Sequence, residues 1–202
     1  MTAGESVARR LQAVIKPGSS KRAAVWFVLV AVSVLGRLWQ PAWNVTPLMG
    51  AAIASGVAFS HPFAATSVPL AALTVSNLAL PGYGIHDWKG VAMVAVIAVA
   101  LSWPVLLGGL VRRHRATAAI CGALAGSLVF YLSTNFAHWL LTDDYPHTVE
   151  GLLACYGAAL PFFRWMPVGD VAWTLAFVGG LFACRGTADS AERIPHETTV
   201  AA

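Results

Sequence analysis

Long uncharged apolar stretches, separated by short polar segments, dominate the pattern of this chain. A helix needs about 20 predominantly apolar residues to cross a bilayer, and the stretch over 91–111 has 21 residues without a charge. The first three stretches lie near the short end of that range. The pattern predicts an all-α integral membrane bundle of six transmembrane helices, over residues 23–36, 46–60, 64–80, 91–111, 116–141 and 167–184.

One further apolar stretch, Gly151 to Phe163, is too short for a comfortable span, since it holds 13 residues before Arg164. We therefore expect a re-entrant or interfacial helix before the last span. Asp144 and Pro146 suit its start, as a cap and as a first-turn proline.

The composition agrees with a lipid environment. Hydrophobic residues make up 57% of the chain and charged residues 11%, against about 25% charged residues in a soluble domain. The net charge of +4 does not indicate nucleic acid as a partner, because the basic residues cluster at the ends of apolar stretches. The lipid bilayer is the expected partner, and there is room for one bundle and no second domain.

The placement of Lys and Arg predicts the topology. With six spans and the N-terminus inside, ten of these residues fall in inner segments and three, Arg37, Lys89 and Arg164, fall in outer loops. This positive-inside bias predicts cytoplasmic N- and C-termini. Seven spans remain the alternative, with a weaker bias of eight against five.

The sequence pattern divides the chain into three parts. Residues 1–22 form a basic cytoplasmic segment, expected as a short surface helix or a disordered tail and not as a cleavable signal peptide. Residues 23–184 form the six-helix membrane domain. Residues 185–202 are polar, and we expect a disordered cytoplasmic tail.

Aromatic and polar side chains crowd the predicted outer loops. Five of the eight tryptophans lie on that side: Trp39, Trp43, Trp88, Trp139 and Trp165. An aromatic belt at the headgroup level explains part of this. A small-molecule pocket open to the outside explains why the crowding is one-sided.

Polar residues within apolar stretches are costly in hydrocarbon and therefore informative. Asn77 ends the third predicted helix, and Asn135 and His138 lie three residues apart on one face of the fifth. Asn135 and His138 either offer hydrogen bonds to a ligand or form hydrogen bonds to a neighbouring helix. Arg37 either binds a ligand or snorkels to the interface. Asp170 is expected to cap the last helix.

Enzyme and metal signatures are absent from the sequence. It contains no GxSxG, no HExxH and no glycine-rich phosphate loop. Cys121, Cys155 and Cys184 are widely spaced in apolar sequence, and we interpret them as small buried hydrophobes. We expect no catalytic residue, no metal and no cofactor.

Several stretches resemble a family of uncharacterised bacterial six-helix membrane proteins. They cover most of residues 37–180 and lie at 37–38, 44–47, 76–78, 134–139, 145–164 and 169–170. That family is in turn similar to the substrate-binding S components of energy-coupling factor vitamin transporters, especially the solitary cobalamin-transporting type. The resemblance implies a bacterial cytoplasmic (inner) membrane protein with a vitamin-like ligand and an ATPase module as a partner.

Two departures from the resembled pattern stand out. The family's usual aspartate after Ser76 is Asn77 here, and residues 80–90 contain no cysteine to bind cobalt. His86 is the candidate substitute, so cobalamin itself is not indicated. The expected ligand-binding residues, at the outer helix ends and loops, are Arg37, Asn44, Asn77, Tyr83, His86, Asn135, His138, Tyr145 and Arg164.

Three functions fit the sequence. The first is the substrate-binding component of a transporter for a vitamin-like micronutrient. The second is a non-catalytic membrane subunit that packs in a larger complex. The third is a haem-binding or redox membrane protein, although the histidines do not pair on facing apolar helices.

Overall fold

The structure, a computed structural model, describes residues 19–40, 44–80 and 85–192, and these are helical without a strand among them. The all-α prediction is therefore confirmed for the described part of the chain. The predicted surface helix before residue 19, Tyr83 and the last ten residues lie outside it. The helices are α2 (Ser19–Leu38), α3 (Leu48–Ala58), α4 (Pro62–Asn77), α5 (Trp88–Ser102), the 3₁₀ helix η1 (Trp103–Leu107), α6 (Gly108–Leu141), α7 (Val149–Phe163) and α8 (Met166–Glu192).

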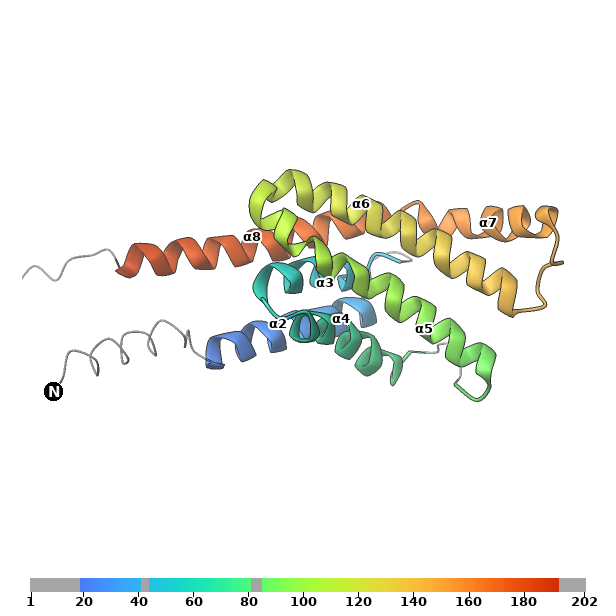
Figure 1. The fold of residues 1–202 in the computed structure, drawn as a ribbon, viewed down its shortest axis with the longest axis horizontal. Helices are drawn as coiled ribbons and strands as arrows, with labels where there is room; N and C mark the ends of the chain where they lie inside the picture. The colour runs from blue at the N-terminus through green and yellow to red at the C-terminus, as the bar shows by residue number, and fades with distance from the viewer. Residues whose placement is uncertain (1–18, 41–43, 81–84, 193–202) are drawn as a thin grey trace, which may run out of the picture.

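The helices form an elongated bundle (Figure 1). The beginning of α2 and the end of α8 lie at one end of the bundle, and the α6–α7 loop lies at the other. Helix α3 lies in the middle, packed against α2, α4, η1, α6 and α8. We call the end that holds residues 142–148 the α6–α7 end.

Helix α3 is the core of the bundle. Ten of its eleven residues are buried. Its small side chains let neighbours approach closely: a Cβ at Gly50 would lie 2.7 Å from the carbonyl carbon of Trp173 in α8. On the other side, a Cβ at Gly56 would collide with the Val105 carbonyl oxygen of η1. Gly50 and Gly56 are therefore required by backbone contacts on two sides.

The predicted span over 46–60 is shorter than expected. At 1.5 Å per residue α3 is roughly 16 Å long, about half the hydrocarbon thickness of a bilayer. Pro47 precedes α3, and α3 ends before Phe59, whose φ of −109° and ψ of 136° are extended. The Arg112 Nη1 atom donates hydrogen bonds to the carbonyl oxygens of Gly56, at 2.6 Å, and Val57, at 3.2 Å. This guanidinium satisfies the C-terminal carbonyls of α3.

The longest apolar helical segment is a hairpin. Two segments among the described residues are long and apolar enough to cross a membrane, Trp88–Leu141 and Met166–Cys184. The first has 54 residues and would be about 80 Å long if straight. It reverses at Arg115, whose φ of 50° and ψ of −123° are non-helical, and α6 then packs back against α5. The break lies in the basic stretch 112–115 that separates the two predicted spans.

The outer surface of the bundle is apolar and part of its interior is polar. Phe27 of α2, Val99 of α5 and Leu106 of η1 each expose more than 60% of their surface. Ser33, Ser127 and Asp170 are buried. Soluble monomers rarely expose large contiguous apolar patches. The exposed apolar side chains and the two apolar segments together indicate a membrane-associated protein.

The last part of the chain differs from the prediction at three points. Helix α7 is present, but its N-cap is Thr148, whose side chain accepts from the Gly151 amide, and not Asp144. Helix α8 begins at Met166 and runs on to Glu192, so residues 185–192 are helical and not a disordered tail. Asp170 consequently lies inside α8 and does not cap it. Alanines at 183, 188 and 191 favour this continuation.

Cys121 and Cys184 are exposed, and of the three cysteines only Cys155 is buried as expected. Exposure of Cys121 and Cys184 remains compatible with a lipid environment, because a small hydrophobic side chain can also face lipid.

Gly56→Ala should lower the free energy of unfolding by about 1–3 kcal/mol, because the added methyl group meets the backbone of η1. Gly179→Ala is the matched control, since a Cβ added there would meet no atom of another helix within 4 Å. Thermal unfolding of both variants in detergent checks this. Equal midpoints for the two variants would contradict the close α3–η1 contact.

Candidate functional site

A cavity of about 420 Å³ opens between α5, α6 and α7 towards the α6–α7 end of the bundle. We call it the cleft. Its apolar walls include Met93, Ile97, Phe130, Phe162 and Phe163. Its polar lining residues are Asn44, Tyr131, Thr134, Asn135, His138 and Tyr145. An apolar cavity with a few polar groups is the usual form of a small-molecule site.

Four of the nine predicted site residues line the cleft together: Asn44, Asn135, His138 and Tyr145. Asn135 donates to the Tyr131 carbonyl oxygen of its own helix at 2.8 Å. That bond stays within α6, so it does not support the alternative that Asn135 joins two helices. The His138 Nε2 atom lies 3.1 Å from Asp144 Oδ2 at the mouth of the cleft.

Two tyrosines hold α7 against α6 and thereby shape one wall of the cleft. The Tyr131 hydroxyl donates to the Tyr156 carbonyl oxygen at 2.6 Å, and the Tyr156 hydroxyl donates to the Leu132 carbonyl oxygen at 2.8 Å. The Tyr131 ring also packs on Phe163, with ring centroids 4.4 Å apart. This reciprocal pair was not predicted from the sequence, because nothing along the chain shows that the two tyrosines meet.

Asn44 lies where α7 gives way to α8. Its Nδ2 atom donates to the Phe162 carbonyl oxygen at 3.3 Å, in the last turn of α7. Asn44 has a φ of 62°, in the left-handed region that asparagine tolerates better than most residues. Asn44 thus joins the segment before α3 to the end of α7, and it also lines the cleft.

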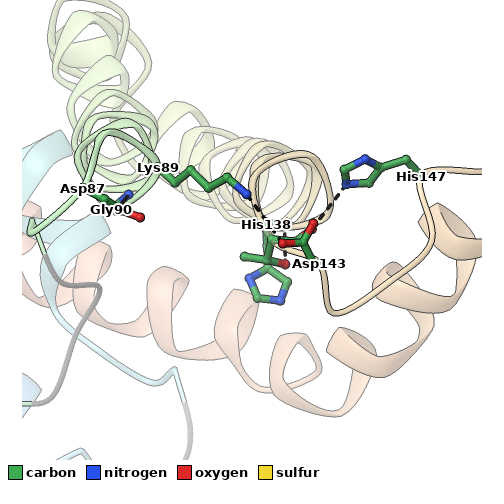
Figure 2. A network of polar contacts seen from close by, with 7 residues as sticks. Asp87, Lys89, Gly90, His138, Asp143 and His147 are labelled. Carbon is green, nitrogen blue, oxygen red and sulfur yellow. Dashed lines mark hydrogen bonds and ion pairs between the residues drawn. The ribbon is translucent and has the colours of Figure 1, made fainter.

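Polar contacts tie the mouth of the cleft together at the α6–α7 end (Figure 2). Lys89 of α5 reaches Asp143, just beyond α6, with Nζ and Oδ2 3.7 Å apart. The His147 ring points back to the end of α6, where its Nε2 lies 3.3 Å from the Thr142 carbonyl oxygen. Trp139 donates to the Pro146 carbonyl oxygen at 2.9 Å. These contacts fix the α6–α7 loop beside the entrance.

Arg37 lines a second, smaller cavity of about 130 Å³, which shares Asn44, Ile97, Phe130 and Met166 with the cleft. The Arg37 Nη1 atom donates to Ser76 Oγ and Asn77 Oδ1, both at 2.6 Å. Two of the predicted site residues are thus bonded to each other. The bonds join the end of α2 to the end of α4, so Arg37 does more than reach towards the membrane surface.

Asp170 also lines the smaller cavity, although the sequence pattern predicted it only as a cap. It is 2% exposed, and its Oδ2 accepts a hydrogen bond from Ser127 Oγ at 2.6 Å. Asp87, Asp143, Asp144 and Glu150, by contrast, are exposed. A buried polar group in α8, paired with α6, is typical of functional positions in membrane proteins.

The remaining predicted residues lie away from both cavities or outside the described chain. The Arg164 guanidinium lies 5.6 Å from the Trp165 ring centroid and lines neither cavity. His86 is exposed near the start of α5. Tyr83 lies outside the described residues. Within the described residues, no three His, Cys, Asp or Glu side chains are placed to hold a metal ion.

Comparison with known proteins places the chain in a family. Residues 18–191 match the model of the DUF6580 family, described as a family of unknown function. Because the match covers most of the 202 residues, the chain belongs to that family. No curated protein and no solved structure matches. The resemblance to S components therefore stays a prediction from the sequence.

Removing both tyrosine hydroxyls tests how α7 is held. Tyr131→Phe combined with Tyr156→Phe removes two hydrogen bonds worth about 1 kcal/mol each. Amide exchange in α7 should therefore become roughly 30-fold faster, as hydrogen–deuterium exchange with mass spectrometry can measure. Ser133→Ala is the control, because its hydroxyl bonds only within α6. Unchanged exchange in α7 would show that other contacts hold the wall.

Proposed function

We propose that this chain is the substrate-binding component of an uptake transporter for a vitamin-like micronutrient, in a bacterial cytoplasmic membrane. The cleft carries the proposal, because it brings Asn44, Asn135, His138 and Tyr145 together from distant parts of the sequence. Its volume of about 420 Å³ suits a small organic molecule. The aromatic walls favour a ligand with a flat apolar body and a few hydrogen-bonding groups.

The proposed topology has six passages through the membrane. They are α2, α3, α4, α5 with η1, α6, and finally α7 followed by α8. Helix α3 is a short passage enclosed by the others. Helices α7 and α8 run in line along α6 (Figure 1), so we assign them to one passage interrupted near Arg164. This replaces a separate re-entrant helix and keeps both termini cytoplasmic.

The charge distribution supports this orientation. Arg112, Arg113 and Arg115 lie at the α5–α6 hairpin, opposite the α6–α7 end. An excess of basic residues marks the cytoplasmic side. The cleft then opens outwards, as uptake requires. Since the sequence holds no nucleotide-binding motif, a separate ATPase module would supply energy.

A non-catalytic membrane subunit is the second candidate. Leu153 and Leu160 of α7 are 65% and 54% exposed, and such a face suits a partner helix as well as lipid. This candidate needs no ligand in the cleft. A bound small molecule therefore separates the two functions.

Native mass spectrometry of the protein extracted from its own host membrane should detect a bound small molecule. Asn135→Ala combined with His138→Ala should lower the retained fraction about tenfold or more, because two polar contacts of about 1 kcal/mol or more each are lost. Ser133→Ala on the same helix should retain the ligand. An empty wild-type protein, or equal retention in all variants, would contradict the proposed function.

Arg164→Ala tests a residue that the sequence predicts as ligand-binding but that does not line the cleft. Because Arg164 lines neither cavity, we expect ligand retention within about twofold of wild type, well below the tenfold that one lost contact of about 1.4 kcal/mol gives. Loss of the ligand in this variant would show that Arg164 is a ligand-binding residue.

Cysteine labelling in intact cells tests the topology. In a background with Cys121, Cys155 and Cys184 replaced by serine, Asp143→Cys should react with a membrane-impermeant maleimide. Arg113→Cys should react only after lysis, because the hairpin is placed on the cytoplasmic side. The reverse labelling pattern would show that the protein has the opposite orientation in the membrane. A C-terminal tag that is accessible in intact cells would favour seven passages.

A further inference from the structure

The floor of the smaller cavity has a chemistry that the cleft lacks. Asp170 of α8 lines it and is 2% exposed. Ser127 donates one hydrogen bond to a carboxylate oxygen at 2.6 Å. Asn44 and Thr46, which also carry side-chain oxygens, line the same cavity.

An ionised carboxylate in this position needs a positive charge nearby. Removing a charge from water is costly, and one hydroxyl compensates only part of that cost. The described ion pairs use Asp143 and Asp144, and within residues 19–40, 44–80 and 85–184 no Lys, Arg or His side chain lies within 4.0 Å of the Asp170 carboxylate.

Arg37 lines the same cavity without serving as that partner. Its Nη1 donates to Ser76 and Asn77 at 2.6 Å and to the Leu73 carbonyl oxygen at 3.4 Å. These three bonds hold it at the end of α4. The Asp170 carboxyl group and the Arg37 guanidinium therefore line one cavity without an ion pair between them.

We infer that the smaller cavity binds one small cation, with Asp170 as its counter-ion. The cation is either the protonated amine of a ligand in the cleft or a free alkali-metal ion. Both present a compact positive charge, and about 130 Å³ holds a few water-sized groups at about 30 Å³ each. For a ligand amine, the inference rests on the proposed function. The ligand would reach Asp170 from the part of the cleft next to Asn44 and Phe130, which line both cavities.

Thermal unfolding of the full chain in detergent tests the inference without a known ligand. Sodium, potassium or methylammonium chloride replaces N-methyl-D-glucamine chloride at constant pH and ionic strength. A cation that binds the folded state raises Tm with saturation, whereas N-methyl-D-glucamine is too bulky for the cavity. We expect a saturable rise of several degrees with at least one small cation. A rise with an alkali-metal ion identifies a free ion, and a rise with methylammonium alone identifies a ligand amine.

Asp170→Asn should abolish the selective rise while its amide oxygen still accepts from Ser127. Asp143→Asn is the matched control, because it removes one carboxylate that is 90% exposed and should leave the rise unchanged. If Asp170→Asn does not fold, Ser127→Ala retains the carboxylate and should retain the rise.

Identical midpoints in all four chlorides would overturn the inference, as would the same rise in Asp170→Asn. This failure is distinguishable from failure of the proposed function. Ligand retained in native mass spectra without a cation effect overturns only the cation site. A cation effect in a protein that retains no ligand contradicts only the proposed function.

Discussion

The approach of neighbouring backbones to α3 sets the dimensions of the bundle. Gly50 lets the backbone of α8 lie against α3 on one side, and Gly56 lets η1 do so on another. Because α3 is only eleven residues long, the surrounding helices extend beyond it. Towards the α6–α7 end, the bundle extends past the first residue of α3. There α3 no longer separates α5 and α6 from α7, and no α3 residue lines the cleft. The cleft opens there, so the same short helix that packs the core also leaves room for the site.

The interruption between α7 and α8 is the second condition for a site. The Phe162 carbonyl oxygen, in the last turn of α7, accepts a hydrogen bond from Asn44, a residue that precedes α3. The segment before the central helix is thus joined to the interrupted passage. Movement of α7 would alter both the aromatic wall of the cleft and the entrance beside Tyr145.

Hydropathy and charge predicted the helices well, because both properties are local. The basic residues 112–115 marked the hairpin, and residues 151–163 were expected to form a helix and do so. The pattern overestimates the length of α3, because apolarity alone does not distinguish a buried helix from a spanning one. The pattern places Asp170 at a helix start, whereas α8 begins four residues earlier, at Met166; helix boundaries are the least certain part of such a prediction.

The candidate site was predictable only in part, for a related reason. Asn135 and His138 stood out because polar groups are rare in apolar stretches, and they line the cleft. Arg164 and His86 had the right residue types in the right loops, but the direction in which a loop side chain points follows from tertiary packing. The pairing of Tyr131 with Tyr156 and of Ser127 with Asp170 likewise depends on the alignment of α6 with the last two helices.

That alignment gives the two cavities different physical roles. Near the α6–α7 end, α6 faces α7 through the Tyr131 and Phe163 rings and through two tyrosine–carbonyl hydrogen bonds, none of which carries a charge. Deeper in the bundle, α6 faces α8 through Ser127 and Asp170, where the effective dielectric constant is lower and a charge is recognised more strongly. Under the proposed function, a ligand in the cleft would therefore meet selection by shape first and, at Asp170, selection by charge second.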